Sequence, residues 1–406
     1  MTSTDGPALL PASELELYAW EIVRYQQARW ALSTRCLSKD PLLAGEALGY
    51  NQPSSSSNEP AGSCIRNLAN TDPPGHTRLR KLLAKALTPG RMKRMRPQIV
   101  RAAGILADRI AQQGSVDLVR SFILPLQIMA TCDLFGIPPR HRAGFGALAA
   151  GMRVPADSEE LSATYHEAYR RMGILVAEVL ATKREQIRIT DSPELQPDVL
   201  SALVSARDDS DGLTVQETQS LAMLLISAGQ NPTIDLIANG MRALLLNPDQ
   251  LQLFRRHPEL RPQAVEELLR YSAPVLSALR IAAEDMTIGD TVVRGGSVIS
   301  VSLGSAHRDP SQFHEPDAFD ISRKHIAHLA FGHGIHYCIG APLARLQASV
   351  ALTVLVERFL HIALVHSPER LRWRPVRDSR SRLELPVTLG PSEIQSPSGY
   401  GAPPAP

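Results

Sequence analysis

The amino-acid sequence predicts a mainly α-helical protein with small β-sheets, and three observations lead to this fold class. Apolar residues recur at helical spacing over most of residues 98–186,. Two further helical patterns run from Thr214 to Asn247 and from Ala341 to Leu360. Between these two patterns, TIGDTVVRGGSVISVSL (287–303) alternates apolar and polar residues, as short strands do,.

Composition narrows the class of protein. With 406 residues, 44% of them hydrophobic, the chain can bury a large core as one big domain or two,. A formal net charge of +2 argues against nucleic-acid binding,. The N-terminus has no basic segment followed by an apolar run long enough to cross a bilayer. The four cysteines lie far apart without CxxC spacing, which indicates a reducing cytoplasm: Cys36, Cys64, Cys132 and Cys338,. We therefore expect a soluble cytoplasmic protein that binds neither nucleic acid nor membrane.

The N-terminal part carries the weakest signals. We expect a flexible arm over residues 1–12, followed by a helix from Ser13 to Leu32 with Glu16 three residues after the Ser13 cap,. Residues 41–60 are rich in Ser, Asn, Gly and Pro. They predict a mobile loop, and a plain surface linker is the alternative.

A basic helix begins within DPPGHTRLRKLLAKAL (72–87), where His76 and Arg80 lie one turn apart on one face,. On a basic helix, such a pair is more often solvated than part of an anion site. Eight cations make this the most basic part of the chain: Arg78, Arg80, Lys81, Lys85, Arg91, Lys93, Arg94 and Arg96. A surface of this kind suits an acidic protein partner.

The helical pattern of residues 98–186 breaks at 136–140 and at 155–158. The next helix begins with a capping box, Thr214 and Glu217, and extends for about nine turns. Pro232 deprives the carbonyl group of Ala228 of its helix hydrogen bond, so we expect a kink or an opening there.

Cys338 lies in FGHGIHYCIGAPLAR (331–345), between a glycine-rich turn and the last long helix. Pro342 suits the first turn of that helix because its missing N–H would be unbonded there in any case. Free amide groups and the positive end of the helix dipole both favour a charged sulfur. The arrangement therefore predicts a thiolate.

Several kinds of chemistry use a thiolate, and most do not fit this one. Cys338 has no second cysteine nearby for a disulfide, and a Cys–His hydrolase would need it in an electropositive cleft. A zinc site with His333 and His336 would lack a complete tetrahedral set. Axial ligation of heme iron fits a lone cysteine in a glycine-rich loop, and an ordinary core cysteine is the alternative.

Phe331-x-x-Gly334-x-x-x-Cys338-x-Gly340 resembles the heme-binding signature of the cytochrome P450 superfamily, in its soluble bacterial form. The resemblance covers roughly residues 60–390 and implies heme b (iron protoporphyrin IX) held between the helix that begins at Thr214 and the Cys338 loop, with Cys338 as the iron ligand. The heme-binding residues that it implies are His76, Arg80, Arg280, Phe331, Gly332, His336, Cys338 and Gly340. Residues 13–390 would form the heme-thiolate catalytic domain, and 391–406 a disordered tail.

The resemblance also gives roles to residues whose spacing alone says little. Glu267 and Arg270 lie three apart, which is usually a surface pair, but in the family such a pair joins an arginine, here Arg323, to hold the thiolate loop. Residues 41–60 would lie over the distal side of the heme, and Arg153 to Tyr169 near the lid helices. Four residues would face the pocket or the core: Val275, Leu276, Ala278 and Leu279.

The candidate catalytic residues depart from the family pattern. They are Ala228, Gly229, Gln230, Asn231, Pro232 and Thr233. Ala228 and Gly229 match the family's dioxygen groove. The acid and threonine that usually follow are replaced by Asn231, which cannot ionise, and Pro232, which has no hydroxyl group.

This departure leads us to expect oxidative radical coupling of an aromatic peptide, indole or phenol in bacterial secondary metabolism. The alternative is a conventional hydroxylating monooxygenase in which Thr233, Gln230, water or a substrate hydroxyl supplies protons. A peroxygenase, a heme-based sensor and a non-heme helical binding protein are further alternatives. The family resemblance implies a small organic substrate, electrons from a ferredoxin and ferredoxin reductase, and a monomer.

Overall fold

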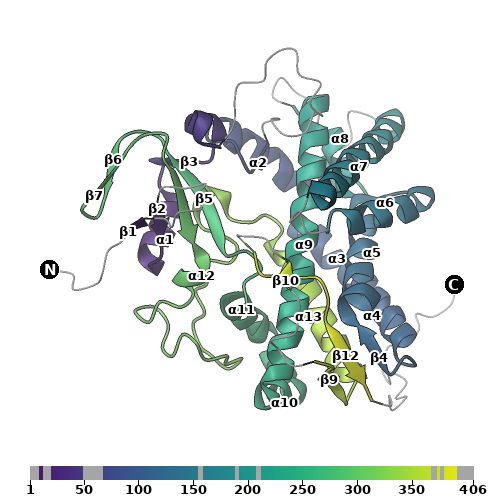
Figure 1. The fold of residues 1–406 in the computed structure, drawn as a ribbon. Coiled ribbons are helices and arrows are strands. Elements are labelled where there is room, and N and C mark those ends of the chain that lie inside the picture. Colours follow the sequence, from purple (N-terminus) through teal and green to yellow (C-terminus); the bar gives the residue numbers. More distant parts are fainter. Residues whose placement is uncertain are drawn as a thin grey trace.

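The computed structural model describes residues 9–11, 20–48, 67–153, 159–187, 192–206, 212–366, 373–374 and 379–390. The expectations for residues 1–8, 12–19, 49–66, 154–158 and 391–406 lie outside the described residues. Figure 1 shows a helical part on the right and a strand-rich part on the left, with α9 running vertically between them. This division confirms a mainly helical fold with small sheets.

The helices account for most of the described chain. The α-helices are α1 (Tyr25–Ser33), α2 (Gly75–Ala86), α3 (Pro89–Arg94), α4 (Arg96–Ile110), α5 (Leu124–Phe135), α6 (Pro139–Gly151), α7 (Glu159–Gln186), α8 (Val199–Ser205), α9 (Val215–Leu246), α10 (Pro248–Arg256), α11 (Arg261–Tyr271), α12 (Leu303–Ala306) and α13 (Ala341–Arg358). Shorter turns are η1 (Pro41–Leu48), the π-helix η2 (Val119–Ile123), η3 (Pro193–Leu195), η4 (Pro258–Leu260) and η5 (Gly334–His336).

The strands form four small sheets. They are β1 (Leu9–Pro11), β2 (Trp20–Ile22), β3 (Leu37–Ser38), β4 (Ser115–Asp117), β5 (Ser277–Ala282), β6 (Met286–Ile288), β7 (Thr291–Val293), β8 (Val298–Ser302), β9 (Ile362–Leu364), β10 (Trp373–Arg374), β11 (Ser381–Arg382) and β12 (Pro386–Leu389). The largest sheet has the order β1-β2-β8-β5-β3, and β4-β12-β9 form the next. In the largest sheet, β2 and β8 are parallel.

Helix α9 organises the helical part. The expected capping box is present, since the Thr214 side chain accepts from the Glu217 amide at 3.1 Å and the Glu217 carboxylate accepts from the Thr214 amide at 2.8 Å. The helix packs against α5, α7, α11 and α13. In the described part of the chain it is also the one helix long and apolar enough to span a membrane, but 61% of its most apolar window is buried inside the protein. It is therefore a core helix.

Proline 232 does not end α9, because the helix continues through it to Leu246. The break expected at 136–140 is confirmed, because Gly136 ends α5 with a φ of 64° and α6 begins at Pro139. A side chain at Gly136 would also meet the Asp198 carboxylate at 2.3 Å. Glycine is therefore required there both by the left-handed backbone and by the contact.

Four local expectations were wrong, and in three of them pairing with another strand overrides local preference. The expected helix from Ser13 to Leu32 begins only at Tyr25, since residues 20–22 form β2 and pair with β8. In the expected loop 41–60, residues 41–48 form η1. Within the pattern of 98–186, residues 115–117 form β4 and pair with β12. In addition, Leu9–Pro11 of the expected N-terminal arm pairs with β2 as β1.

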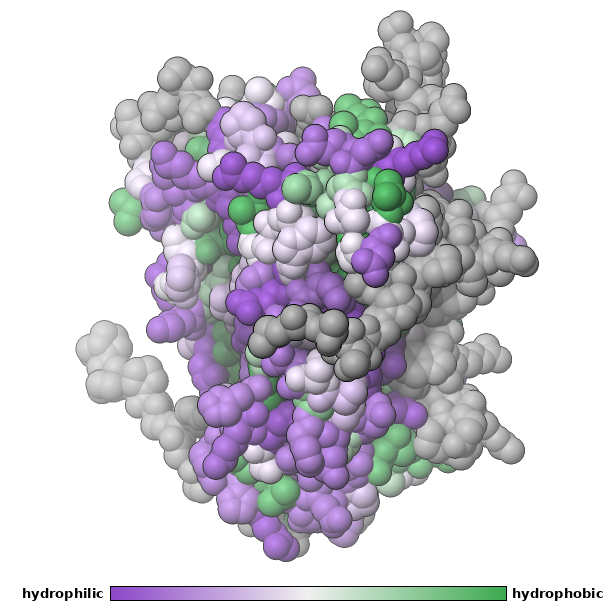
Figure 2. Space-filling model, turned by 90° about the vertical axis from the view of Figure 1, so that its left-hand side faces the viewer, coloured by the Kyte–Doolittle hydropathy of each residue, from purple (hydrophilic) through white to green (hydrophobic). Residues whose placement is uncertain are grey.

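The face on the left of Figure 1 is mainly hydrophilic where described residues form it, as Figure 2 shows. Apolar residues on that face are scattered. Such single exposed apolar residues are normal for a protein surface.

A fully buried ion pair holds the segment that leads to the Cys338 loop. Glu267 and Arg270 on α11 are both 0% exposed, and the carboxylate accepts from Arg270 Nε at 2.8 Å and from Nη2 at 2.7 Å. Arg270 also donates to the carbonyl oxygens of His307, Pro316 and Ala318.

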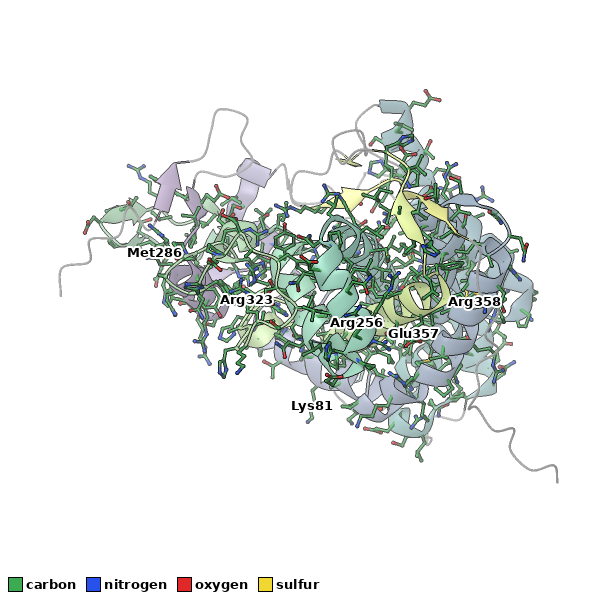
Figure 3. All side chains as sticks on the ribbon, turned by 90° about the horizontal axis from the view of Figure 1, so that it is seen from below. Lys81, Arg256, Met286, Arg323, Glu357 and Arg358 are labelled. Carbon is green, nitrogen blue, oxygen red and sulfur yellow. The ribbon has the colours of Figure 1, made fainter. Side chains whose placement is uncertain are left out.

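The third member of this cluster is Arg323, whose Nε lies 3.3 Å from the Glu267 carboxylate. It donates in addition to the carbonyl oxygens of His314 and Glu315. The side-chain view in Figure 3 shows Arg323 between the strand-rich end marked by Met286 and the helices marked by Arg256. The expected cluster of Glu267, Arg270 and Arg323 is thus present, and it ties the meander after α12 to α11.

Replacing Glu267 by Gln should strongly destabilise the fold, because the buried guanidinium of Arg270 and the half-buried guanidinium of Arg323 would lose their counter-ion. We expect the free energy of unfolding to fall by about 3–5 kcal/mol, measured by urea denaturation followed by circular dichroism. The matched control is Glu259→Gln, which removes an exposed partner of His257 and should leave the free energy of unfolding nearly unchanged,. Equal losses in the two variants would show that the buried cluster contributes nothing special.

Candidate functional site

A largely apolar cavity of about 470 Å³ lies between α9 and the Cys338 loop. Its walls come from α2, α5, α9, the start of α13, the β5 region and the loop that carries Phe331 to Gly340. Val275 and Ala278 line it, whereas Leu276 and Leu279 do not, which resolves the choice left open for these four residues. The cavity is the site around which the candidate residues are arranged.

Cys338 forms part of the cavity wall. It is exposed, but the surface that it exposes faces the cavity. Its amide group donates to the carbonyl oxygen of Phe331 at 2.9 Å, which closes the loop into a tight turn. Gly334 has a φ of 73°, and a Cβ atom there would lie 2.8 Å from the Cα atom of Ser33 on α1. The loop can therefore pack on α1 only with glycine at this position.

Burial of Cys338 works against the thiolate that the sequence predicts there. Burial raises the pKa of the Cys338 thiol and outweighs the hydrogen bonds from the Gly340 and Ala341 amides and the charge of Arg80. A bound metal ion reverses this balance, because its charge deprotonates a coordinating thiol outright. The two amides are then already in place to accept the anion.

A polar cluster lies at one end of the cavity. Arg80 from α2 and Arg280 from β5 line the wall together with His336. The rings of His76 and His336 are 4.4 Å apart between centroids. Among the described residues, both Nε2 atoms are buried without a hydrogen-bond partner. Two such orphaned donors, beside two arginines, indicate that a ligand rich in oxygen belongs here.

The protonation of this cluster follows from its surroundings. Burial lowers the pKa of His336 to about 3, and the ring lies 3.9 Å from the Asp72 carboxylate, too far for a hydrogen bond. Burial also lowers the pKa of His76. Both rings are therefore neutral at pH 7, and each can donate one N–H without adding charge.

Lys39 is the member of the cluster that the sequence did not reveal. It lines the cavity and donates to the carbonyl oxygen of Leu279 at 3.3 Å. Burial and the neighbouring Arg280 lower the pKa of Lys39 to about 8, so most of it remains charged at pH 7. Three cations with one carboxylate, Asp72, leave the cluster with a net charge of +2. That charge matches the two propionates of protoporphyrin IX.

The residues present therefore fit heme b. Cys338 could hold the iron, and Arg80, Arg280, Lys39 and the two histidines could hold the propionates. Heme bound through a thiolate supplies the activation of dioxygen. Among the described residues, no three His, Cys, Asp or Glu side chains come together as metal ligands, so the zinc alternative has no ligand set.

The structure divides the six candidate catalytic residues into two groups. Ala228, Gly229, Pro232 and Thr233 line the cavity, whereas Gln230 and Asn231 do not. Thr233 donates its hydroxyl to the carbonyl oxygen of Gly229 at 3.0 Å. Pro232 has no hydroxyl group, and Thr233 carries the hydroxyl group of α9 that lies nearest to Pro232 in sequence.

Two residues on α5 complete this wall and were also missed from sequence. Gln127 donates to the same Gly229 carbonyl at 3.1 Å and lies 3.5 Å from the Thr131 hydroxyl. All three polar side chains, Gln127, Thr131 and Thr233, are buried and line the cavity. No sequence signal connects α5 to α9, since the residues are about a hundred positions apart and meet only through packing.

Behind the thiolate loop, Arg345 of α13 is fixed by Glu266 of α11. The Arg345 guanidinium donates to both Glu266 carboxylate oxygens at 2.7 and 2.8 Å and to the Tyr337 hydroxyl at 3.2 Å. Although burial opposes it, hydrogen bonding from Arg345 and His328 lowers the pKa of Glu266 to about 2. The pair therefore stays ionised and supports the loop from below the cavity.

Comparison with known proteins gives a consistent result. The family model described as Cytochrome P450 matches residues 254–373. The chain is similar to Cytochrome P450 107B1 of Saccharopolyspora erythraea, with 38% identity over 92% of this chain and 90% of the relative. It is 36% identical to the 6-deoxyerythronolide B hydroxylase of the same organism, over 91% and 90% of the two chains. Among solved structures, the Bacillus subtilis bacillaene polyketide synthase cytochrome P450 PksS superposes with a TM-score of 0.81 at 31% identity, covering 91% of this chain and 90% of that one.

Replacing Cys338 by Ser should remove the sulfur ligand while leaving the cavity in place. We expect the variant to lose the absorption band that the reduced, carbon-monoxide-bound protein shows when iron is held by a thiolate. Cys36→Ser, which changes an exposed cysteine that does not line the cavity, is the control and should keep the band. Retention of the band in the Cys338 variant would exclude this residue as the ligand.

Replacing Lys39 by Met should weaken the hold on heme, because one of the two net positive charges that match the propionates is lost. We expect about tenfold faster transfer of heme to an acceptor apoprotein, equivalent to about 1.4 kcal/mol. Lys39→Arg should transfer heme at nearly the parent rate. Lys81→Met removes an exposed lysine at the edge of the molecule in Figure 3 and controls for net charge. Equal rates for the Lys39→Met and Lys81→Met variants would contradict a role for Lys39.

Proposed function

Because the chain belongs to the cytochrome P450 family and is therefore a heme monooxygenase of the secondary-metabolite type, we propose that it inserts one oxygen atom into an apolar small molecule. The observation that carries this proposal is the largely apolar cavity beside Cys338, whose polar side chains, apart from the propionate end and Gln347 on α13, lie on α5 and α9. An apolar substrate would bind there by burial of its surface. Gln127, Thr131 and Thr233 are the polar groups available to orient it or to hold water.

Polyketide-type compounds are the substrate class that we favour. One similar protein is named 6-deoxyerythronolide B hydroxylase, and one similar structure belongs to a bacillaene polyketide synthase system. Both names associate this fold with large, mainly apolar carbon skeletons. A cavity with few hydrogen-bonding side chains fits such a skeleton better than it fits a peptide, whose amides would need partners.

Thr233 is the residue that we propose for proton delivery. Its hydroxyl is buried, lies on the cavity wall and is held by the Gly229 carbonyl. A hydroxyl can accept one proton while it donates another, so it can pass protons that Pro232 cannot. Gln127 on the same carbonyl would keep this part of α9 in place.

Oxidative coupling of an aromatic substrate is the second candidate, and one specific observation favours it. At the position of the family's acid stands Asn231, whose amide cannot act as an acid, and it does not line the cavity,. An enzyme that removes two hydrogen atoms from its substrate and joins two carbons, or carbon and nitrogen, places no oxygen in the product. Indoles and phenols are the groups that would react in this way.

We further propose a monomeric, cytoplasmic protein that receives electrons from a ferredoxin and its reductase. Lys93, Arg94 and Arg96 are exposed and lie close together at the end of α3 and the start of α4. This basic segment suits the acidic surface of a ferredoxin, and such attraction mainly accelerates association.

Turnover under ¹⁸O₂ separates the two candidates. Candidate substrates are first screened by the shift that they cause in the Soret band. Macrolactones represent oxygenation, and dipeptides that contain phenol or indole groups represent coupling. We expect the product to be a macrolactone with one ¹⁸O atom, while the second oxygen atom leaves as water with two electrons and two protons. A dimeric or cyclised product without ¹⁸O would contradict oxygenation and establish coupling.

A further inference from the structure

A buried ion pair connects α9 to the end of α6, beside the residue that replaces the family's acid. Arg153 follows α6 directly, and its Nη2 atom lies 2.7 Å from Asp235 Oδ1 on α9. The two side chains are only 6% and 3% exposed. Charges buried to this extent are costly unless they are paired, so neither residue can be removed alone without a large effect.

The same guanidinium also reaches Asn231. Its Nη1 atom donates to Asn231 Oδ1 at 3.4 Å, and Asn231 Nδ2 donates to the carbonyl oxygen of Met152 at 3.4 Å. Asn231 and Asp235 lie four residues apart, hence on one face of α9. That face is directed toward the end of α6 and away from the cavity, which neither residue lines.

A carboxylate at position 231 would lie beside the Asp235 carboxylate on the same guanidinium. Two carboxylates so close together in a buried place repel each other, so the neutral Asn231 suits a position that has Asp235 as its neighbour.

We propose that Asp235 is a positioning residue for the α9 side of the cavity, an inference that rests on the proposed function. It holds Arg153 against α9, and Arg153 in turn fixes the Asn231 amide and fastens the end of α6 next to Pro232. Asp235 does not take over proton transfer, because it does not line the cavity and the intervening guanidinium does not release a proton,. The protons enter instead on the cavity side, where Thr233 lies.

This division of roles has a structural consequence. Helix α6 packs against both α5 and α7, so a contact that fastens its end also restrains the layer of helices over this side of α9. Breaking the pair should loosen that layer and admit water and small ligands to the cavity. It should do so without changing any residue that lines the cavity.

The test uses three variants of the heme-loaded protein. Asp235→Asn breaks the pair. Asn231→Asp adds a second carboxylate to Arg153. The double variant Asn231→Asp with Asp235→Asn returns one carboxylate to the guanidinium, one turn earlier. Glu167→Gln, which neutralises an exposed ion pair with Arg170 on α7, is the matched control.

Two measurements do not depend on substrate or turnover. These are the rate at which imidazole binds to the ferric protein and the thermal midpoint of the Soret band. We expect Asp235→Asn to bind imidazole at least about fivefold faster and to melt earlier. The double variant should return both values close to those of the parent, and the control should change neither.

The third measurement is the share of electrons lost as hydrogen peroxide during turnover. It should rise in Asp235→Asn and return close to the parent value in the double variant, whose acid at position 231, like Asp235, pairs with Arg153 and does not line the cavity. If Asp235→Asn does not fold, Asp235→Glu and Arg153→Lys take its place and should show smaller changes of the same sign.

Parent-like imidazole binding and melting in Asp235→Asn would overturn the proposal. So would a double variant as unstable as Asp235→Asn, because the pair would then be a structural contact tied to position 235. Failure of the proposed oxygenation would appear only in the ¹⁸O₂ experiment, since ligand binding and melting do not depend on the product formed.

Discussion

The central interaction of this structure is the bond that the sulfur of Cys338, on the wall of an apolar cavity, can form to heme iron. Burial alone keeps this sulfur protonated, against the pull of the Gly340 and Ala341 amides and the charge of Arg80. The site thus offers two amide donors and one cation to an anionic sulfur, but it lacks the further positive charge that would offset burial. A metal ion supplies that charge, and a thiolate ligand in turn makes the iron of heme reactive toward dioxygen. Three contacts hold the loop that carries Cys338 in place. They are the contact of Gly334 with α1, the ion pair of Arg345 with Glu266, and the cluster of Glu267, Arg270 and Arg323.

Electrostatic matching appears in two places, one at an end of the cavity and one on the far side of α9. At the end of the cavity, three cations and one carboxylate leave the charge that two propionates would neutralise, and two neutral histidines offer donors without adding charge. On the far side of α9, the Arg153 guanidinium pairs with the Asp235 carboxylate and also reaches the neutral Asn231 amide. Between them the cavity is mostly apolar. The protein therefore places its buried charges where a partner is present and leaves the substrate space nearly free of them.

Sequence predicted the parts of this structure that are fixed by short-range rules. The capping box at Thr214, the stop at Gly136 and the glycine turn before Cys338 each follow from a few neighbouring residues, and all three are present. The strand at Trp20–Ile22 was missed because one of its two pairing partners, β8, lies about 280 residues away in the sequence. Lys39, Gln127 and Asp235 were missed for a related reason. Each is an ordinary residue in its own segment and becomes part of the site only when packing brings it to an arginine, a carbonyl group or the cavity wall.

We infer a heme-thiolate enzyme whose reaction depends on the polar side chains of α9 and α5 in an otherwise apolar space. X-ray absorption at the iron edge of the ferric, heme-loaded protein reports the atoms bound to the metal and does not depend on substrate, partner or turnover. If Cys338 is the iron ligand, one sulfur atom will be found bound to the iron and will be lost when Cys338 is replaced. Iron bound by nitrogen and oxygen alone in the parent protein would contradict this assignment.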